Sequence, residues 1–264
     1  MVQIDGYHLT SAEVIRVARE FEPVLISDEG KRQVYESRQR LENLLKIDRA
    51  VYGINTGFGI FADQMIPNRA SARLSRNLIL SHSVGAGEPL PDEVVRAAML
   101  VRANTLVKGF SGVRLEIVET LVNMLNSGVT PVVPSQGSLG SSGDLCPLSH
   151  LALVFTTDDA DREEDSGQAW YQGKLMSGKA AMQAAGIERL VLGAKEGLAL
   201  NNGATVSAAL AALAIEDADY LMRVGDVSLA MSLEAVLGCS SAFDERLHAV
   251  RGHPGTLALA GSSI

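Results

Sequence analysis

Residues 197–222 read GLALNNGATVSAALAALAIEDADYLM, and they give the clearest indication of the fold class. Alanine has the highest helix propensity of the amino acids, and its small side chain allows neighbouring helices to approach closely. We therefore interpret the segment 194–222 as one long, mostly buried helix of a bundle. Apolar residues recur at steps of three and four residues in three other segments, which predicts further helices at 68–83, 91–108 and 112–126.

Two earlier helices have recognisable starting residues. Thr10 is followed three residues later by Glu13, which is the pattern of a capping box. Ser27 similarly precedes a long stretch of mixed polar and apolar residues. Strand patterns are few, since the segment 129–134, VTPVVP, looks extended but contains two prolines. Because strands and helices do not alternate along the chain, a doubly wound sheet is disfavoured, and we expect an all-α protein.

The composition narrows the class of protein. With 264 residues, 47% of them hydrophobic, the chain is long and apolar enough to bury a large core. The formal net charge of −8 argues against a nucleic-acid partner, because phosphate binding relies on Lys and Arg. No apolar run reaches the ~18 residues of a membrane helix, and the first residues, MVQIDGYHLT, do not resemble a secretory signal. The two cysteines, Cys146 and Cys239, show no metal-binding spacing, so we expect a cytoplasmic protein without membrane contact or bound metal.

Three loops interrupt the predicted helices. Two are rich in glycine, YGINTGFG at 52–59 and SQGSLGSSGDLCP at 135–147. The third, TDDADREEDSG at 157–167, is strongly acidic, and we expect it to be a solvated surface loop.

The residue types at 137–144 allow several interpretations. The simplest is a glycine-rich turn with a helix cap at Ser142 or Asp144. A phosphate-binding loop would end in Gly-Lys-Ser/Thr, whereas the carboxylate of Asp144 after Gly143 would repel phosphate. A serine-hydrolase turn needs G-x-S-x-G after a strand, and that spacing is missing. The remaining chemistry is backbone cyclisation, in which an unhindered glycine amide attacks the carbonyl two residues earlier and the middle serine loses water to give an electrophilic alkene.

The segment GSLGSSGDLCPLSH at 137–150 resembles the signature of the aromatic amino acid ammonia-lyase family, in which an Ala-Ser-Gly triplet becomes methylidene-imidazolone (MIO). Further segments match the family in the same order along nearly the whole chain: YGINTGFG at 52–59, LILSHSVGAGEPL at 78–90, KGFSGVR at 108–114, KEGLALNNG at 195–203, SLEAVLG at 232–238 and FDERLHAVRG at 243–252. Several long motifs in one order are far more specific than a single loop, so the resemblance favours cyclisation over a plain turn.

The resemblance implies that MIO forms autocatalytically from Ser141, Ser142 and Gly143, without an external cofactor. Ser142 would supply the methylidene carbon, and Asp144 would assist the cyclisation. Ser141 stands where the family usually has Ala, and because cyclisation uses its backbone carbonyl, a small side chain there should be tolerated.

The resemblance also implies the residues that act on the substrate. Tyr52 would be the base that removes the β-proton, which requires a pKa below its ordinary value of about 10. Asn202 would hydrogen-bond near the electrophile or the substrate amine, and the loop Gly57-Phe58-Gly59 would cover the site. His82, in the pair Ser81-His82, favours L-histidine as the substrate, because an imidazole can hydrogen-bond another imidazole and an apolar wall cannot. The reaction would be the non-oxidative deamination of L-histidine to trans-urocanate and ammonia, the first step of histidine degradation.

The family's architecture implies an all-α fold and a homotetramer whose active sites combine residues of more than one subunit. We expect residues 1–110 to form an N-terminal helical domain with the Tyr52 loop and the His82 helix. Residues 111–264 would begin the central long-helix bundle that carries the triplet. The family's chains are considerably longer, so we expect this chain to be an N-terminal portion without the C-terminal catalytic groups. Asn201 departs from the family, where an apolar residue is common.

Three alternatives remain open from the sequence. One is another MIO-dependent aromatic amino acid lyase or an aminomutase. A second is an inactive fragment or relative in which MIO does not form. The third and most remote is a serine hydrolase that uses Ser142.

Overall fold

The computed structural model describes residues 1–47, 51, 53–54, 56, 67, 70–139 and 143–255. Met1–Leu213 form one compact unit and Ala214–Ile264 a second. The division into residues 1–110 and 111–264 stays a prediction. Within the described residues, no helix is long and apolar enough to cross a bilayer, and no cluster of three metal-ligating side chains occurs.

The chain begins with a small βαβ element. Strand β1 (Val2–Ile4) pairs in parallel with strand β2 (Val24–Ile26), and helix α1 (Ser11–Arg19) connects them along the chain. This alternation of strand and helix was not predicted, because strands of three residues are too short to show a periodic pattern. The predicted capping box is confirmed, since Thr10 Oγ1 accepts the Glu13 N–H at 3.3 Å and Glu13 Oε2 accepts the Thr10 N–H at 3.0 Å.

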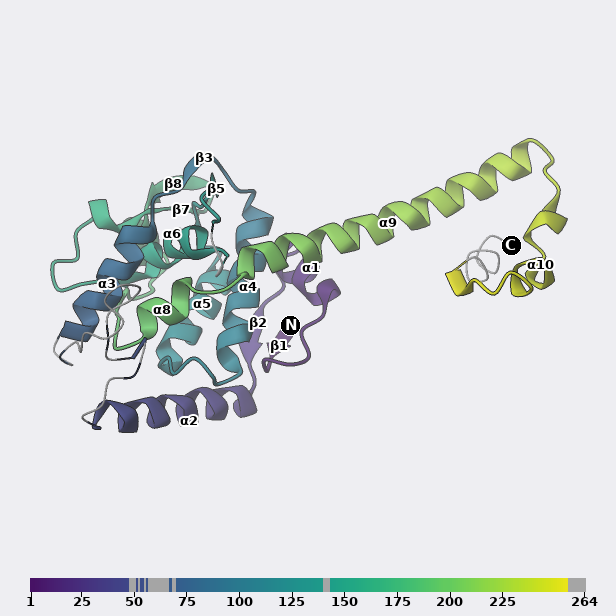
Figure 1. The fold of residues 1–264 in the computed structure, drawn as a ribbon. Coiled ribbons are helices and arrows are strands. Elements are labelled where there is room, and N and C mark those ends of the chain that lie inside the picture. Colours follow the sequence, from purple (N-terminus) through teal and green to yellow (C-terminus); the bar gives the residue numbers. More distant parts are fainter. Residues whose placement is uncertain are drawn as a thin grey trace. The chain divides into compact units, whose positions relative to one another are not determined.

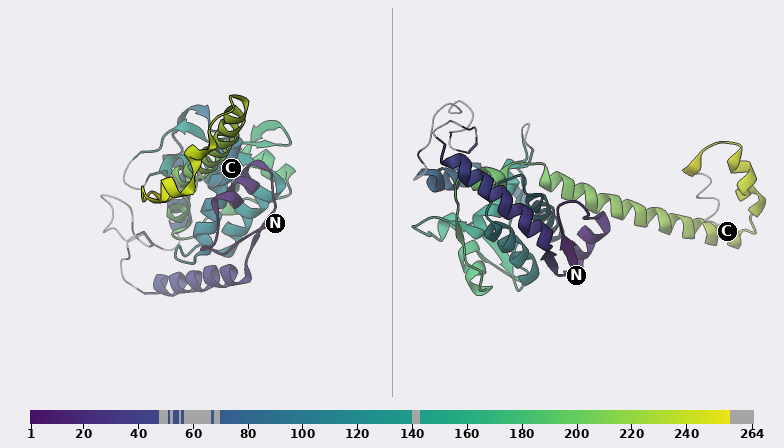
Figure 2. Two further views of the ribbon diagram at one scale, coloured as in Figure 1. Left: turned by 90° about the vertical axis from the view of Figure 1, so that its right-hand side faces the viewer. Right: turned by 90° about the horizontal axis from the view of Figure 1, so that it is seen from below.

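Helix α2 (Asp28–Leu45) also starts where the sequence predicted, because Ser27 Oγ accepts the Gly30 N–H at 2.9 Å. Helix α2 lies along one side of the first unit in Figures 1 and 2, against α4 and α5.

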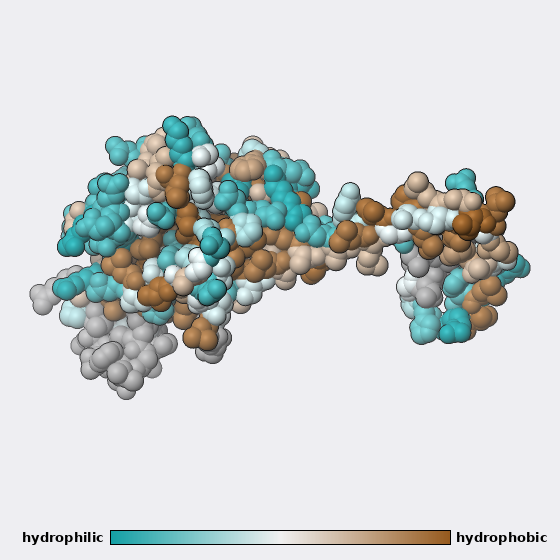
Figure 3. Space-filling model, turned by 90° about the horizontal axis from the view of Figure 1, so that it is seen from above, coloured by the Kyte–Doolittle hydropathy of each residue, from teal (hydrophilic) through white to brown (hydrophobic). Residues whose placement is uncertain are grey.

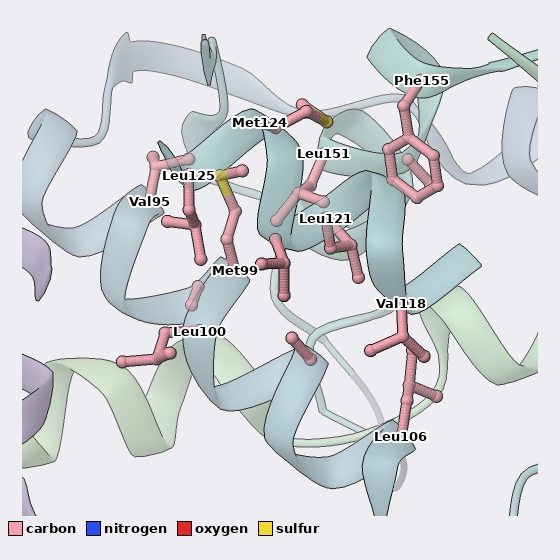
Figure 4. Packing of buried hydrophobic residues seen from close by; sticks show 14 of the residues in the cluster. Val95, Met99, Leu100, Leu106, Val118, Leu121, Met124, Leu125, Leu151 and Phe155 are labelled. Carbon is pink, nitrogen blue, oxygen red and sulfur yellow. The ribbon is translucent and has the colours of Figure 1, made fainter. Parts of the chain in front are cut away.

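The core of the first unit lies between helices. The three predicted segments are confirmed within a few residues at each end as α3 (Ser71–His82), α4 (Asp92–Val107) and α5 (Leu115–Ser127). Figure 4 shows side chains of α4, α5 and α6 (Leu145–Phe155) packed together, among them Met99, Leu121 and Phe155, all fully buried. Each such side chain stabilises the fold by about 1.5–3 kcal/mol. The helix on which the triplet loop ends, α6, is therefore held in the core.

Short strands surround these helices. Strand β3 (Ala86–Pro89) pairs antiparallel with β5 (Pro134–Gln136), and β4 (Thr130–Pro131) pairs antiparallel with β7 (Gln168–Tyr171). Strand β7 continues as a hairpin into β8 (Lys174–Ser177), followed by α7 (Gly178–Ala184). Strands β6 (Thr156–Thr157) and β9 (Leu190–Val191) pair in parallel and hold the two ends of the segment that contains the acidic loop. The 3₁₀ turn Glu164–Ser166 lies within that loop. The fold remains mainly helical, as predicted.

The long helix predicted at 194–222 is wrong in two respects. It is divided into α8 (Glu196–Asn201) and α9 (Thr205–Ala235), because Asn202 is extended and Gly203 has φ +143°. It is also not mostly buried, since within α9 only Thr205, Val206, Ala209 and Leu213 are.

In the second unit, α9 exposes many large apolar side chains: Ile215, Tyr220, Leu221, Met222, Val224, Val227, Leu229 and Met231. Figure 3 shows hydrophobic surface, in brown, over this part of the chain. The 3₁₀ turn Ser240–Phe243 and the short helix α10 (Glu245–Ala249) follow.

Candidate functional site

The loop at 135–144 that carries the predicted triplet ends at Gly143 and Asp144. This end lies against residues 202–204, which separate α8 from α9. Gly143 and Gly203 form an isolated parallel bridge, and the Asp144 N–H donates to the Gly203 carbonyl at 3.0 Å. Gly203 directly follows Asn202. The bridge therefore brings together the last residue of the predicted triplet and the predicted polar residue beside the electrophile.

Both bridged residues need to be glycine. Gly143 has φ +81° and Gly203 has φ +143°, values that side-chain-bearing residues rarely adopt. A Cβ on Gly143 would be in ordinary van der Waals contact with Ala204, at 3.4 Å, and with the Gly203 carbonyl oxygen, at 3.6 Å. A Cβ on Gly203 would lie 2.9 Å from Nη2 of Arg102, so a guanidinium packs directly against this backbone.

The carboxylate of Asp144 is fixed from two sides. It is 1% exposed, and it accepts the Ser138 hydroxyl at 2.8 Å and the Ser207 hydroxyl at 3.0 Å. It also accepts the Ser207 backbone N–H at 3.0 Å, in the first turn of α9, where helix N–H groups lack an intrahelical acceptor. Asp144 thus joins the start of α6 to the start of α9, next to Gly143.

The guanidinium of Arg102 on α4 places a positive charge beside Gly203, at the junction where the starts of α6 and α9 meet the end of α8. Arg102 is 3% exposed, and its Nη1 donates to the Ala199 carbonyl of α8 at 3.4 Å. Burial lowers the pKa of Arg102 to about 10, and attraction to the Asp144 carboxylate opposes that shift.

Helix α8 is held by a buried carboxylate and by a close helix contact. Glu196 is fully buried, and its two oxygens accept from Nε and Nη2 of Arg114 at 2.9 and 2.8 Å and from the Gly193 N–H at 2.6 Å. Burial alone would raise the pKa of Glu196, but these hydrogen bonds outweigh it and the pKa is lowered. A Cβ on Gly197 would lie 2.5 Å from the Ser75 carbonyl, so this glycine allows α8 to approach α3.

His82 is the last residue of α3 and is half-buried. Its Nδ1 lies 2.9 Å from the Leu78 carbonyl and 3.1 Å from the Ser81 hydroxyl. Because a carbonyl oxygen only accepts, this geometry places the proton on Nδ1 of the neutral ring and leaves Nε2 as an acceptor.

The segment after His82 is anchored to α6. Nε2 of His150 accepts the Gly85 N–H at 2.9 Å, and burial lowers the pKa of His150, which favours the neutral ring that this bond requires. The helix that follows the triplet loop therefore also fixes the chain beyond His82.

The predicted residues fall into two groups. Tyr52, Ser141, Ser142 and the loop Gly57-Phe58-Gly59 lie outside the described residues. Gly143 and Asp144 meet Gly203 as described, and Asn202 is the exposed residue that ends α8, its N–H donating to the Leu198 carbonyl at 3.0 Å. The structure also shows the neighbour of Tyr52: a Cβ on Gly53 would lie 2.9 Å from Cδ2 of the same Leu198.

Four further residues of this junction were not predicted from the sequence: Arg102, Ser138, Ser207 and His150. Ser138 and His150 lie within the segment GSLGSSGDLCPLSH, but nothing in the segment assigned them a role, and Arg102 and Ser207 lie in none of the matching segments. The departure noted at Asn201 has a visible consequence, since this residue is fully buried and its Nδ2 donates to Ser149 Oγ of α6 at 3.3 Å.

Comparisons with known proteins identify the family. The family model "Aromatic amino acid lyase" matches residues 9–263. Histidine ammonia-lyase of Alkaliphilus oremlandii is 47% identical over 98% of this chain and 50% of its own length, and that of Alkaliphilus metalliredigens is 49% identical over 96% and 48%. The chain thus spans about half the length of these curated relatives.

Solved structures show the same fold. Histidine ammonia-lyase from Trypanosoma cruzi superposes with a TM-score of 0.87 at 37% identity, covering 98% of this chain and 48% of that one. A phenylalanine aminomutase from Pantoea agglomerans superposes with a TM-score of 0.90 at 32% identity, covering 100% and 49%. The chain belongs to the aromatic amino acid lyase family.

Proposed function

We propose that the protein takes part in the deamination of L-histidine to trans-urocanate and ammonia, as an MIO-dependent ammonia-lyase. The observation that carries the proposal is the Gly143–Gly203 bridge, which sets the end of the predicted triplet beside Asn202. The names of the relatives, which are histidine ammonia-lyases at 47–49% identity, support histidine as the substrate.

The described residues fit an MIO group formed from Ser141, Ser142 and Gly143. Gly143 has the left-handed backbone that a tight bend requires, and no side chain shields its amide. Asp144 beside it is buried and rigidly held, so the end of the loop is pinned on both the α6 and the α9 side. Once formed, the group would supply an electrophilic carbon for the substrate amine.

The chain's own residues would bind and orient the substrate. Nε2 of His82 accepts a hydrogen bond from the N–H of the substrate imidazole, while Nδ1 stays bound to the Leu78 carbonyl. Asn202, exposed at the end of α8, offers an amide to the substrate amine. Tyr52 removes the β-proton. The next residue, Gly53, lies close to Leu198 of α8, since an added Cβ would be 2.9 Å from its Cδ2, and this supports the proposal that the base acts near α8. Catalysis requires that the weakly acidic C–H bond be oriented towards that base.

We further propose a cytoplasmic homotetramer with sites completed by other subunits. The exposed apolar side chains of α9 after Ala214 support a large interface of this kind. The free thiols of Cys146 and Cys239 are in keeping with a reducing compartment.

An aminomutase is the second candidate, because the structure from Pantoea agglomerans, a phenylalanine aminomutase, shares the fold at a TM-score of 0.90. An inactive relative without MIO is the third. Supplying L-histidine, L-tyrosine and L-phenylalanine separately, and following the ultraviolet absorbance of the unsaturated product, distinguishes them. The proposal requires urocanate from histidine at a far higher kcat/KM than any product from the other two. Formation of a β-amino acid would support the aminomutase, and no product from any of the three would support the inactive relative.

A further inference from the structure

Gly85 lies where three parts of the first unit meet. A Cβ added to it would lie 3.1 Å from Nε2 of His150 and 3.2 Å from Sγ of Cys146, both on α6, and 3.1 Å from Cβ of Pro134, at the start of β5. A Cβ on Gly137 would in turn lie 3.3 Å from the Cα of Gly85. The backbone of Gly85 is therefore packed between α6 and the loop that carries the predicted triplet.

One hydrogen bond joins the two sides of this contact. The Gly85 N–H donates to Nε2 of His150 at 2.9 Å. Nε2 can accept only in the neutral ring, because a protonated imidazole donates from both of its nitrogens. After protonation, two N–H groups would face each other, and the Gly85 N–H would lose this acceptor. The bond therefore exists only while His150 is neutral.

The segment that this bond holds leads directly from His82. Two residues separate His82, at the end of α3, from Gly85. The residue after Gly85, Ala86, pairs with Gln136 in the β3–β5 ladder. The bond to His150 is thus a fixed point between the end of α3 and the start of β3, and its loss would loosen the chain beside His82.

The surroundings of His150 favour the neutral ring. Burial, rather than a charged neighbour, lowers its pKa below the ordinary value of 6.5. On α6 itself, the nearby titratable group is the thiol of Cys146. The elements packed against α6 carry the other titratable or charged side chains, namely Arg73, Arg76 and His82 on α3, Lys179 on α7, Glu196 on α8, and Glu164 and Asp165 in the 3₁₀ turn. Because the folded pKa lies below the unfolded one, the bond is retained above the ordinary pKa and is lost as the pH falls through the lowered one.

We propose that His150 is a positioning residue for substrate binding: its neutral imidazole holds Gly85, and with it the segment after His82, and protonation of the ring releases that segment. This proposal rests on the proposed function, because it takes His82 to bind the substrate. The expected consequence is a KM for L-histidine that rises in acid while kcat changes much less.

Hydrogen exchange of the Gly85 amide tests the bond without any turnover. Exchange is followed by mass spectrometry in the protein as the cell makes it, from about pH 8 to about pH 5, with the intrinsic exchange rate at each pH divided out. In the parent, we expect exchange to become about tenfold faster in acid, the scale of one lost hydrogen bond. His150→Gln keeps an accepting oxygen that does not titrate, so its Gly85 amide should stay protected throughout. His150→Leu has no acceptor, so its Gly85 amide should exchange fast at every pH.

Two controls separate this local effect from unfolding. His8→Gln changes an exposed histidine and should leave the exchange of Gly85 as it is in the parent. Amides of the buried helix α5 report global opening and should not respond to His150. Equal exchange of Gly85 in the parent and in His150→Leu would overturn the proposal. If His150→Leu does not fold, the parent and His150→Gln decide it, because identical pH dependence of Gly85 exchange in these two would overturn it as well.

Steady-state kinetics then tests the role in binding. As the pH falls over the same range, the KM for L-histidine should rise about tenfold more in the parent than in His150→Gln, while kcat of the two differs by less than about threefold. The substrate ionises alike in both assays, so the difference between the two proteins isolates His150. Parallel profiles of KM against pH would contradict the positioning role. A parent that releases no urocanate at any pH would instead contradict the proposed function, and the exchange of Gly85 distinguishes that outcome because it needs no turnover.

Discussion

The carboxylate of Asp144 accepts both the backbone N–H and the hydroxyl of Ser207, each at 3.0 Å. One residue at the start of α6 therefore satisfies the free N–H of another at the start of α9. This link, together with the bridge between Gly143 and Gly203, places the loop end relative to Asn202.

Ser207→Ala should weaken this junction without abolishing it. It removes the hydroxyl that donates to Asp144 but keeps the backbone N–H, and a hydrogen bond to a buried charged group contributes about 1.5–3 kcal/mol. We expect a loss of that size in the free energy of unfolding, measured by denaturant titration, and slower loss of water from the triplet. Ser232→Ala, which removes an exposed hydroxyl of α9, should change stability by less than about 0.5 kcal/mol. Equal effects of the two variants would contradict this account of the junction.

Gly203→Ala should be more damaging than the backbone strain alone explains. At φ +143° any Cβ is strained, by about 1–3 kcal/mol, and here it would also lie 2.9 Å from Arg102 Nη2. Gly128 has φ +77°, and a Cβ there would meet nothing within 4 Å, so Gly128→Ala reports strain without contact. Thermal unfolding of both variants should show the larger loss for Gly203→Ala. If Gly128→Ala loses as much, the guanidinium does not press on this backbone.

We expect the ion pairs of Asp161 with Lys179 and Arg189 to stabilise the acidic loop, and we expect this stabilisation to be lost in acid. Hydrogen bonds from Lys179 and Thr157, and the charge of Arg189, lower its pKa from 3.8 to about 2. Because the folded pKa lies below the unfolded one, the stabilisation is full above pH of about 4 and is lost as the pH falls towards about 2. Asp161→Asn should therefore reduce stability at pH 7, and the difference from the parent should shrink through that window. Asp159→Asn, at an exposed position in the same loop, provides the control; a pH-independent gap for Asp161→Asn would contradict the anchor.

His82→Leu should change substrate choice more than catalysis. Leucine removes the acceptor for the substrate imidazole and leaves an apolar wall, which favours a phenyl ring. We expect the KM for L-histidine to rise at least about tenfold, a loss of about 1.4 kcal/mol of binding, with a relative gain for L-phenylalanine. Ser81→Ala, which leaves the bond from His82 to the Leu78 carbonyl in place, should change the KM for L-histidine by less than threefold. An unchanged KM in His82→Leu would remove His82 from the substrate site.

Much of the fold was predictable because local signals decided it. The capping box at Thr10 and Glu13 and the cap at Ser27 place two helix starts, and apolar periodicity places α3, α4 and α5. The break at Gly203 was missed because alanine and leucine on both sides favour a helix, whereas the bridge to Gly143 is a tertiary contact. The strands were missed because two- to four-residue strands show little alternation.

The candidate site was predictable only in part. The triplet, Asp144 and Asn202 belong to motifs that can be recognised along the chain. The positions of Arg102 and Ser207 at the site could not be predicted from the sequence, because they depend on tertiary contacts. Arg102 of α4 lies against α8 and Gly203, and Ser207 of α9 binds Asp144 at the start of α6. The acidic loop was expected to be a solvated surface loop, yet Ser166 within it is fully buried and Asp161 is bound by Lys179 and Arg189.

The central claim is that a cyclised triplet captures the substrate amine. The most direct measurement is the mass of the peptide spanning 137–150, isolated from protein that deaminates L-histidine. The account predicts a peptide lighter than its sequence by two waters. An unmodified peptide, recovered from protein that releases urocanate at its full rate, would contradict it.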